Sequence, residues 1–159
     1  MKIEEQVLSI EQMKHLQELG VDTSDASLCW HWSDEDGGWV LGFMNSLLRE
    51  ISNPSYSDGP FPAYTIADLI EKLPKRIPHK YKRFIDVDLC LYPHIGLEDD
   101  GTTTETMRVA YQACDINGKS YWHTLPHASE LDLPVKDRLY YALCYIAENY
   151  KELLEVKNE

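Results

Sequence analysis

Cysteine and histidine side chains are the candidates for metal chemistry in this chain, because thiolate sulfur and imidazole nitrogen are ligands that zinc prefers. Cys29 and His31 lie two residues apart in a segment with strand periodicity, so both side chains point to the same side. His123 and His127 lie four residues apart. Cys90 and His94 have the same spacing. A tetrahedral site would need four of these side chains to converge, and structural zinc sites usually contain tight ligand pairs with about two to five residues between the ligands. Cys29 and His31 are closer than that, so we predict no metal site and keep Cys29, His31, His123 and His127 only as candidates.

Carboxylates form a second group of residues that could do chemistry. Asp86 and Asp88 share one face of a predicted strand and would act as an acid/base pair if they were removed from water. A strand face wetted by solvent is the alternative interpretation. The acidic run Asp34-Glu35-Asp36 precedes two glycines but lacks the alternating ligands and later glutamate of a calcium loop. We therefore interpret that run as a hydrophilic turn.

The sequence contains none of the short motifs that identify common enzyme families. It has no G-x-x-x-x-G-K-[ST] phosphate loop, no G-x-G-x-x-G, no G-x-S-x-G nucleophile elbow and no H-E-x-x-H. We therefore predict no catalytic residue, no cofactor and no cofactor-binding residue. A non-catalytic role is favoured, and an enzyme remains the alternative.

Three tryptophans are candidates for an interaction surface. Trp30 and Trp32 alternate with small or polar residues in residues 26–32, and Trp39 opens a second apolar run over residues 39–44. The polar, glycine-containing turn between the two runs predicts a β-hairpin. The three indoles are expected to share one face, where they either pack across the strands or form a platform for a ligand. Together with Asp86 and Asp88 they make up the predicted interaction surface.

Hydrophobic periodicity predicts the elements that position these residues. Helices are expected over about 10–19, with Ser9 and Gln12 as a capping box, and over 66–73, with Thr65 and Asp68 in the same roles. A last helix is expected near the C-terminus, with Asp132 as its cap and Pro134 in its first turn. Strands are expected in the hairpin and over 81–92, 106–116 and 119–125, with Asn117-Gly118 as a two-residue turn. The order α-β-β-α-β-β-β-α predicts an α+β fold: a single antiparallel sheet of about five strands with three helices mainly on one face.

The length of 159 residues fits one domain spanning residues 1–159. Residues 45–63 are rich in proline and serine and are expected to form a long loop. The basic cluster in residues 75–83 is interpreted as a solvated connection, and residues 1–8 and 155–159 are expected to be frayed.

The net charge limits the classes of partner. Fifteen Lys plus Arg against 27 Asp plus Glu give a formal charge of −12. A field of that sign repels phosphate backbones and anionic lipids, so we expect neither nucleic-acid binding through a basic face nor membrane binding. A basic protein partner is allowed, and no oligomeric state is specified. The N-terminus lacks the apolar core of a secretory signal, so the prediction is a cytoplasmic protein with free thiols.

Two stretches resemble a known group of proteins. The stretch Pro62-Ala63-Tyr64-Thr65-Ile66-Ala67-Asp68-Leu69-Ile70-Glu71-Lys72-Leu73-Pro74, and the run 19–26 followed by Cys29-Trp30, resemble small uncharacterised proteins of bacterial genomes, phages and mobile elements. In that group a P-A-aromatic-T-x-x-D helix follows a tryptophan-containing strand. The resemblance implies a shared fold but no activity, cofactor or catalytic residue. The proline-rich loop 52–60 is longer than the group would lead one to expect.

These observations favour a non-catalytic binding or accessory protein with an acidic surface, of mobile-element or phage origin. One alternative is a metal-assisted hydrolase of unknown substrate that uses Cys29, His31 and a neighbouring aspartate. The other is an acidic mimic of DNA, which would need carboxylates spaced like phosphates along one face.

Overall fold

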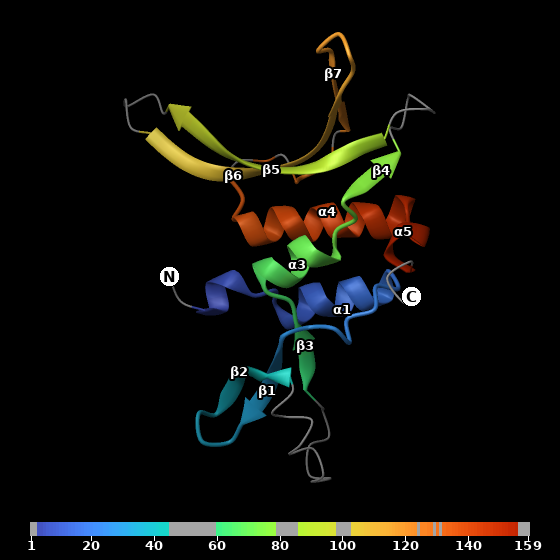
Figure 1. Ribbon diagram of the computed structural model, residues 1–159. Coiled ribbons are helices and arrows are strands. Elements are labelled where there is room, and N and C mark those ends of the chain that lie inside the picture. The colour runs from blue at the N-terminus through green and yellow to red at the C-terminus, as the bar shows by residue number, and fades with distance from the viewer. Residues whose placement is uncertain are drawn as a thin grey trace. The chain divides into compact units, whose positions relative to one another are not determined.

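The computed structural model describes residues 3–44, 60–78, 86–97, 103–123, 125–128, 130 and 132–155. The chain divides into two compact units, Met1–Ile70 and Glu71–Glu159. Figure 1 labels their helices and strands. Helices and antiparallel strands occur in both units, which confirms the α+β class. None of the helices in the described residues is long and apolar enough to cross a membrane.

The prediction of one five-stranded sheet is wrong, because the described strands form two antiparallel sheets. A three-stranded sheet has the order β2-β1-β3, and a four-stranded sheet has the order β4-β5-β6-β7. Alternation of apolar and polar residues indicates that a segment is a strand, but it does not indicate which sheet the strand joins. Two strands of three residues each, β3 (Phe61–Ala63) and β4 (Arg76–Pro78), are too short for alternation to reveal. The first falls in the predicted loop 45–63, and the second falls in the predicted basic connection.

The first unit consists of two helical segments followed by the three-stranded sheet, and a further helix crosses its boundary. Residues 45–59 lie outside the described residues. The elements are η1 (Ile3–Gln6), α1 (Ile10–Glu18), β1 (Leu28–Ser33), β2 (Gly38–Phe43), β3 and α3 (Ile66–Lys72).

The helix α1 is fixed at both ends, as predicted. Ser9 Oγ accepts a hydrogen bond from the Gln12 backbone N–H (3.2 Å), and Gln12 Oε1 accepts one from the Ser9 N–H (3.0 Å). This reciprocal pair satisfies two donors that the first turn would leave without a helical partner. At the other end Gly20 adopts a φ of 81°, and the Val21 N–H donates to the Leu16 carbonyl at 2.9 Å. That pattern is a Schellman motif, in which a glycine takes the left-handed position.

Residues 1–8, which were expected to be frayed, include buried side chains. Val7 and Leu8 are buried, and Val7 forms an isolated antiparallel bridge with Thr65. The Leu8 N–H donates to the Tyr64 carbonyl at 2.9 Å. The segment is therefore tied to the residues that precede α3. At the other end of the chain, residues 156–159 of the terminus expected to be frayed lie outside the described residues.

The stretches that carry the family resemblance are bonded to each other within the first unit. The buried Tyr64 hydroxyl donates to Asp25 Oδ1 (2.6 Å) and lies 2.8 Å from the Asp22 carbonyl oxygen. Ser27 Oγ donates to Asp68 Oδ1 at 2.5 Å. Asp68 also accepts from the Thr65 N–H at 2.8 Å, and its own N–H donates to Thr65 Oγ1. This confirms the predicted capping pair of α3 and adds a second role for Asp68.

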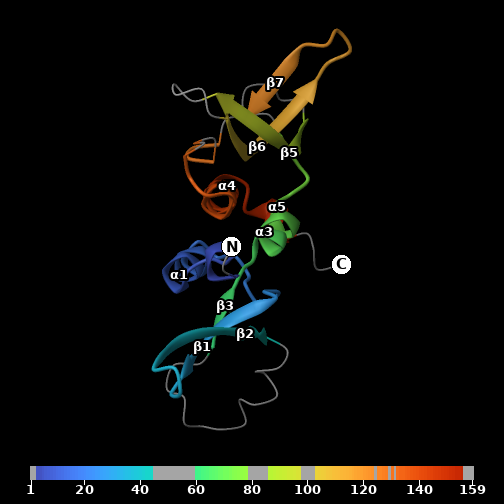
Figure 2. The ribbon, with the colours of Figure 1, turned by 90° about the vertical axis from the view of Figure 1, so that its left-hand side faces the viewer.

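The second unit is the four-stranded sheet with α4 along one face, as Figures 1 and 2 show. The face toward α4 carries buried apolar side chains, including Val87 and Val109, and α4 contributes a buried stripe that includes Leu139, Leu143 and Ile146. The described elements are β4, β5 (Asp86–Leu97), β6 (Thr103–Cys114), β7 (Ser120–His123), α4 (Val135–Asn149) and α5 (Glu152–Glu155).

Two local predictions in the second unit are corrected by the structure. The β6–β7 connection is a three-residue loop, because the Asp115 N–H donates to the Lys119 carbonyl (3.0 Å) and the Gly118 N–H donates to the Asp115 carbonyl (2.9 Å). Asp115 Oδ1 also accepts from the Asn117 and Lys119 N–H groups, which favours the longer loop over a two-residue turn. The N-cap of α4 is Pro134, with no side-chain hydrogen bond, rather than Asp132. Pro134 therefore precedes the first turn and does not lie within it, because its ψ of 147° is not helical.

Candidate functional site

The β1–β2 hairpin places its aromatic side chains on one face of the three-stranded sheet. Trp32 lies directly opposite Trp39, and Trp30 lies opposite Leu41 on one side and Phe61 on the other. Directly opposed residues in a sheet share a face. The three tryptophans therefore lie on the same face, as the alternation predicted, and Phe61 joins them.

Trp32, Trp39 and Phe61 form a group that we call the aromatic corner. The ring centroids of Trp32 and Trp39 are 5.9 Å apart with an interplanar angle of 84°, and those of Trp39 and Phe61 are 5.3 Å apart at 64°. These edge-to-face arrangements are favourable for aromatic pairs. They also leave ring faces at steep angles to one another, so the corner presents more than one π surface.

The aromatic face is covered at one end and open at the other. Val7, Leu28 and Ala63 are buried together, with Trp30 and Leu41 packed against them. The Trp30 indole N–H donates to the Leu8 carbonyl at 2.9 Å, so this indole has a structural role. Trp32, further along the same strand, is 40% exposed. An exposed tryptophan at the open end of an otherwise covered face is a feature typical of interaction surfaces.

The turn between β1 and β2 places carboxylates beside the exposed indole. The Trp32 indole N–H donates to Asp34 Oδ1 at 3.0 Å, and Ser33 Oγ donates to Asp36 Oδ2 at 2.7 Å. Gly37 adopts a φ of 64°, which closes the turn. Asp34, Glu35 and Asp36 are all exposed, and we call these three residues the acidic turn. The indole and the acidic turn therefore form one continuous feature of the surface.

A cation of this protein already lies on the aromatic corner. Lys14 Nζ, from α1, is 4.7 Å from the centroid of the Phe61 ring. This distance is within the range of about 6 Å in which an ammonium is attracted by the ring quadrupole. The contact shows that a ring of the corner can receive a positive charge from a neighbouring segment.

The first two metal candidates lie on the opposite face of the same sheet. Cys29 is fully buried and its thiol donates to the Gly42 carbonyl oxygen at 3.6 Å. Burial raises the pKa of the Cys29 thiol, so the thiolate that a metal requires is disfavoured. His31 follows at the next position on that face and is half-buried. The two side chains share a face, as predicted.

The other two metal candidates belong to the second unit and have partners of their own. His123 is buried on β7, and its Nε2 lies 3.0 Å from the Tyr145 hydroxyl. His127 is exposed, with its Nδ1 2.6 Å from Glu130 Oε1. Among the described residues no group of three His, Cys, Asp or Glu side chains is arranged to hold a metal ion.

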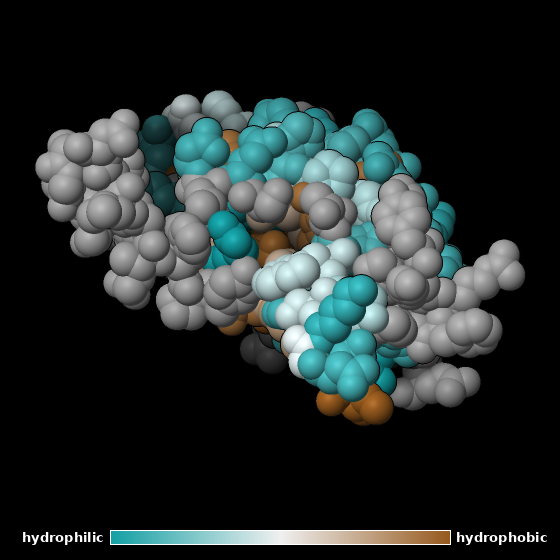
Figure 3. Space-filling view, turned by 90° about the horizontal axis from the view of Figure 1, so that it is seen from above, coloured by the Kyte–Doolittle hydropathy of each residue, from teal (hydrophilic) through white to brown (hydrophobic). Residues whose placement is uncertain are grey.

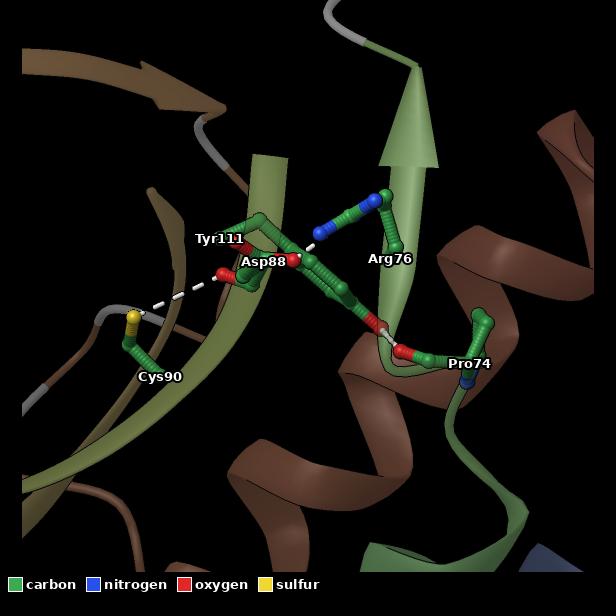
Figure 4. A network of polar contacts seen from close by, with 5 residues as sticks. All are labelled: Pro74, Arg76, Asp88, Cys90 and Tyr111. Atoms are coloured by element: carbon green, nitrogen blue, oxygen red, sulfur yellow. Dashed lines mark hydrogen bonds and ion pairs between the residues drawn. The ribbon is translucent and has the colours of Figure 1, made fainter. Parts of the chain in front are cut away.

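Asp86 and Asp88 lie on the exposed face of β5, on either side of the buried Val87. Asp88 Oδ1 accepts a hydrogen bond from Arg76 Nε at 2.8 Å, and the side chains of Asp88 and Arg76 are both more than half exposed (Figure 4). An exposed ion pair of this kind contributes about 0.2–1 kcal/mol to stability. Because Asp86 and Asp88 remain in water, the arrangement lacks the desolvation that an acid/base pair needs.

The face of the four-stranded sheet opposite α4 is the upper surface in Figure 1 and is turned toward the viewer in Figure 3, where most of the coloured side chains are hydrophilic and a small area is hydrophobic. On β5 the Cys90 thiol donates to the Asp88 carbonyl at 3.5 Å. Tyr111 lies on the other face and donates its hydroxyl hydrogen to the Pro74 carbonyl at 2.7 Å (Figure 4). The first contact lies within β5, the second ties β6 to the residue before β4, and neither brings a reactive pair together.

Two members of the candidate site were not predicted from the sequence. Phe61 lies in the proline-rich segment that was interpreted as loop, and its strand pairs with β1 despite Pro62, which an edge strand tolerates. Lys14 lies on the exposed side of an amphipathic helix, where a lysine is expected for solubility alone. Only the contact between α1 and β3 brings the two residues together.

Comparisons with known proteins give no relative for this chain. No protein-family model, no curated protein and no solved structure matches it.

Proposed function

We propose that this protein is a non-catalytic binding or accessory protein that recognises a basic segment of a protein partner through the aromatic corner and the acidic turn. The observation that carries the proposal is the hydrogen bond between the exposed Trp32 indole and Asp34, which joins an aromatic surface to an acidic one. Arginine and lysine side chains interact favourably with both surfaces, through cation–π contacts and through ion pairs.

The charge of the chain supports the same partner class. A protein with a formal charge of −12 attracts basic segments and speeds their encounter. Tryptophan and arginine are enriched where protein surfaces bind each other. A role as an accessory factor of a phage or mobile element in a bacterial cytoplasm is consistent with the family resemblance and belongs to the same proposal.

The two alternatives have less support. The hydrolase would need Cys29 and His31 beside an aspartate, and the described residues contain no such metal-binding group. The DNA mimic would need uninterrupted carboxylates along one face, whereas the described carboxylate Asp88 is paired with Arg76.

The test is a calorimetric titration of the full chain with a synthetic basic peptide of about ten residues, containing alternating lysine and glycine, at low and at physiological salt. We expect measurable binding that the triple variant Asp34→Asn, Glu35→Gln, Asp36→Asn weakens by about three-fold or more, because each lost exposed ion pair is worth about 0.2–1 kcal/mol. Asparagine at positions 34 and 36 can still accept the hydrogen bonds of the turn, so the hairpin should persist.

Matched controls separate this surface from the overall charge. The variant Glu18→Gln, Glu148→Gln, Glu152→Gln removes the same charge from exposed positions elsewhere and should bind nearly as the wild type does. Trp32→Ala should weaken binding, whereas Trp122→Ala, at an indole that is 46% exposed on β7, should not. Equal loss in both triple variants, or no binding of the peptide, would contradict the proposed function.

A further inference from the structure

The aromatic corner has a geometry that selects among cations. Its rings pack edge to face, with centroids 5.9 Å and 5.3 Å apart and interplanar angles of 84° and 64°, so their outer faces point in different directions. A planar guanidinium stacks best on a single ring, whereas a compact ammonium can contact faces in several directions. The corner therefore suits the alkylammonium group of lysine better than the guanidinium of arginine.

Lys14 supplies evidence that such a group fits. It comes from α1, it is exposed, and its Nζ lies 4.7 Å from the Phe61 centroid. The corner therefore holds an alkylammonium group of its own chain on one of its three rings. Trp32 remains 40% exposed, so this ring of the corner is accessible to a ligand.

We propose that the aromatic corner is a binding site for a lysine side chain, and that Lys14 occupies part of it in the free protein and is displaced by the lysine of the partner. This inference rests on the proposed function and specifies the chemistry that the surface recognises. The incoming ammonium takes the place of Lys14 on the Phe61 ring, and the exposed Trp32, whose indole is hydrogen-bonded to Asp34, supplies a further ring and an opposite charge in the same sheet. Lys14 lies on the exposed side of its helix, so it can leave the ring without opening the core.

The intramolecular contact between Lys14 and Phe61 lowers the affinity of the corner for a lysine of the partner. A ligand that must displace an internal competitor binds with an affinity reduced by the fraction of protein in which the site is occupied. Removal of Lys14 should therefore strengthen binding of a lysine peptide. The same removal also deletes a positive charge, so the expected gain must exceed that of a charge deletion elsewhere.

The experiment compares three peptides of identical sequence that contain lysine, arginine or acetyl-lysine, titrated into the full chain. We expect the lysine peptide to bind about three-fold or more tightly than the arginine peptide, and the uncharged acetyl-lysine peptide to bind weakest. Lys14→Gln should raise the affinity for the lysine peptide about three-fold, whereas Lys151→Gln, at another exposed lysine, should leave it nearly unchanged.

Proton NMR chemical shifts report contact with an aromatic ring, which a general effect of charge would not produce. The ε-CH₂ protons of Lys14 should be shifted upfield by the Phe61 ring in the free protein and should move toward ordinary values when the lysine peptide binds. The ε-CH₂ protons of the bound peptide lysine should shift upfield in their turn.

The possible failures are distinguishable. If basic peptides bind at the acidic turn but show no preference for lysine, or if the Lys14 signals do not change, this inference is overturned and the proposed function stands. If no basic peptide binds to wild type or to Lys14→Gln, both are overturned.

Discussion

Tyr64 joins separate segments of the first unit through its backbone and its hydroxyl group. Its carbonyl accepts from the Leu8 N–H, and its hydroxyl donates to Asp25 beside the Asp22 carbonyl. The residue is 1% exposed, so the hydroxyl has no ready access to bulk water. A buried hydroxyl is tolerated because it is hydrogen-bonded, and the contacts show that Tyr64 holds the 21–26 segment near the start of α3.

At this scale we predict that Tyr64→Phe lowers the free energy of unfolding by about 1–2 kcal/mol, because the substitution removes a buried hydrogen bond while it keeps the ring. Urea unfolding followed by tryptophan fluorescence would measure the loss. Tyr141→Phe is the matched control, since Tyr141 is exposed and its change should stay within about 0.5 kcal/mol. Equal stability of the two variants would show that the Tyr64 hydroxyl contributes nothing.

Among the elements, the β6–β7 hairpin depends on a turn position with a positive φ, which glycine adopts without strain. Gly118 has a φ of 76°, and a β-carbon added at this position would meet no atom within 4 Å. The requirement is therefore one of backbone conformation and not of space. Asp115 supports the same turn by accepting from two backbone N–H groups, which lowers the pKa of its carboxyl group.

We predict that Gly118→Ala destabilises the second unit by about 1–2 kcal/mol, the cost of a left-handed conformation for an L-residue. Gly38→Ala provides a close control, because Gly38 is equally open but lacks a positive φ. That variant should be neutral or slightly stabilising, since alanine restricts the unfolded chain more than glycine does. Thermal unfolding of the two variants tests the difference, and a larger loss for Gly38→Ala would contradict the account of the turn.

Across the whole molecule, burial keeps several acidic groups in their protonated forms. Burial is the largest cause of the raised pKa of Cys144, which goes from 9.0 to about 11, and of the raised pKa values of Tyr64, Tyr111 and Tyr140. Burial also raises the pKa of the Cys29 thiol. In the unfolded chain these groups release protons at their ordinary pKa values, so unfolding is favoured at high pH.

The predicted pH dependence of stability follows from the upward direction of these pKa shifts. A group whose pKa is raised on folding contributes its full stability below its unfolded pKa and loses it as the pH rises through its folded pKa. For Cys144 the loss should run from about pH 9 to pH 11 and amount to on the order of 2 kcal/mol. Urea midpoints measured at pH 7, 9, 10 and 11 should fall, and they should fall less steeply between pH 9 and pH 10 in Cys144→Ala. A midpoint that is constant up to pH 11 would contradict the prediction.

The sequence alone determined the features that depend on neighbours in the chain. The capping box of Ser9 and Gln12, the helical stop at Gly20 and the shared face of Trp30, Trp32 and Trp39 all follow from local spacing, and the structure contains them. Each is decided within a few residues, where periodicity and capping chemistry are strong signals. The α+β class follows from the same local signals.

Only the tertiary structure decided how the strands divide into two sheets and which residues complete the aromatic corner. β3 and β4 are strands because of the strands they pair with, and three residues are too few to show an alternating hydrophobic pattern. Lys14 and Phe61 are separated by more than forty residues and meet through the packing of α1 on β3. Strand pairing and helix packing depend on contacts between residues that are far apart in the sequence. The local hydrophobic pattern does not specify which of these contacts a chain forms.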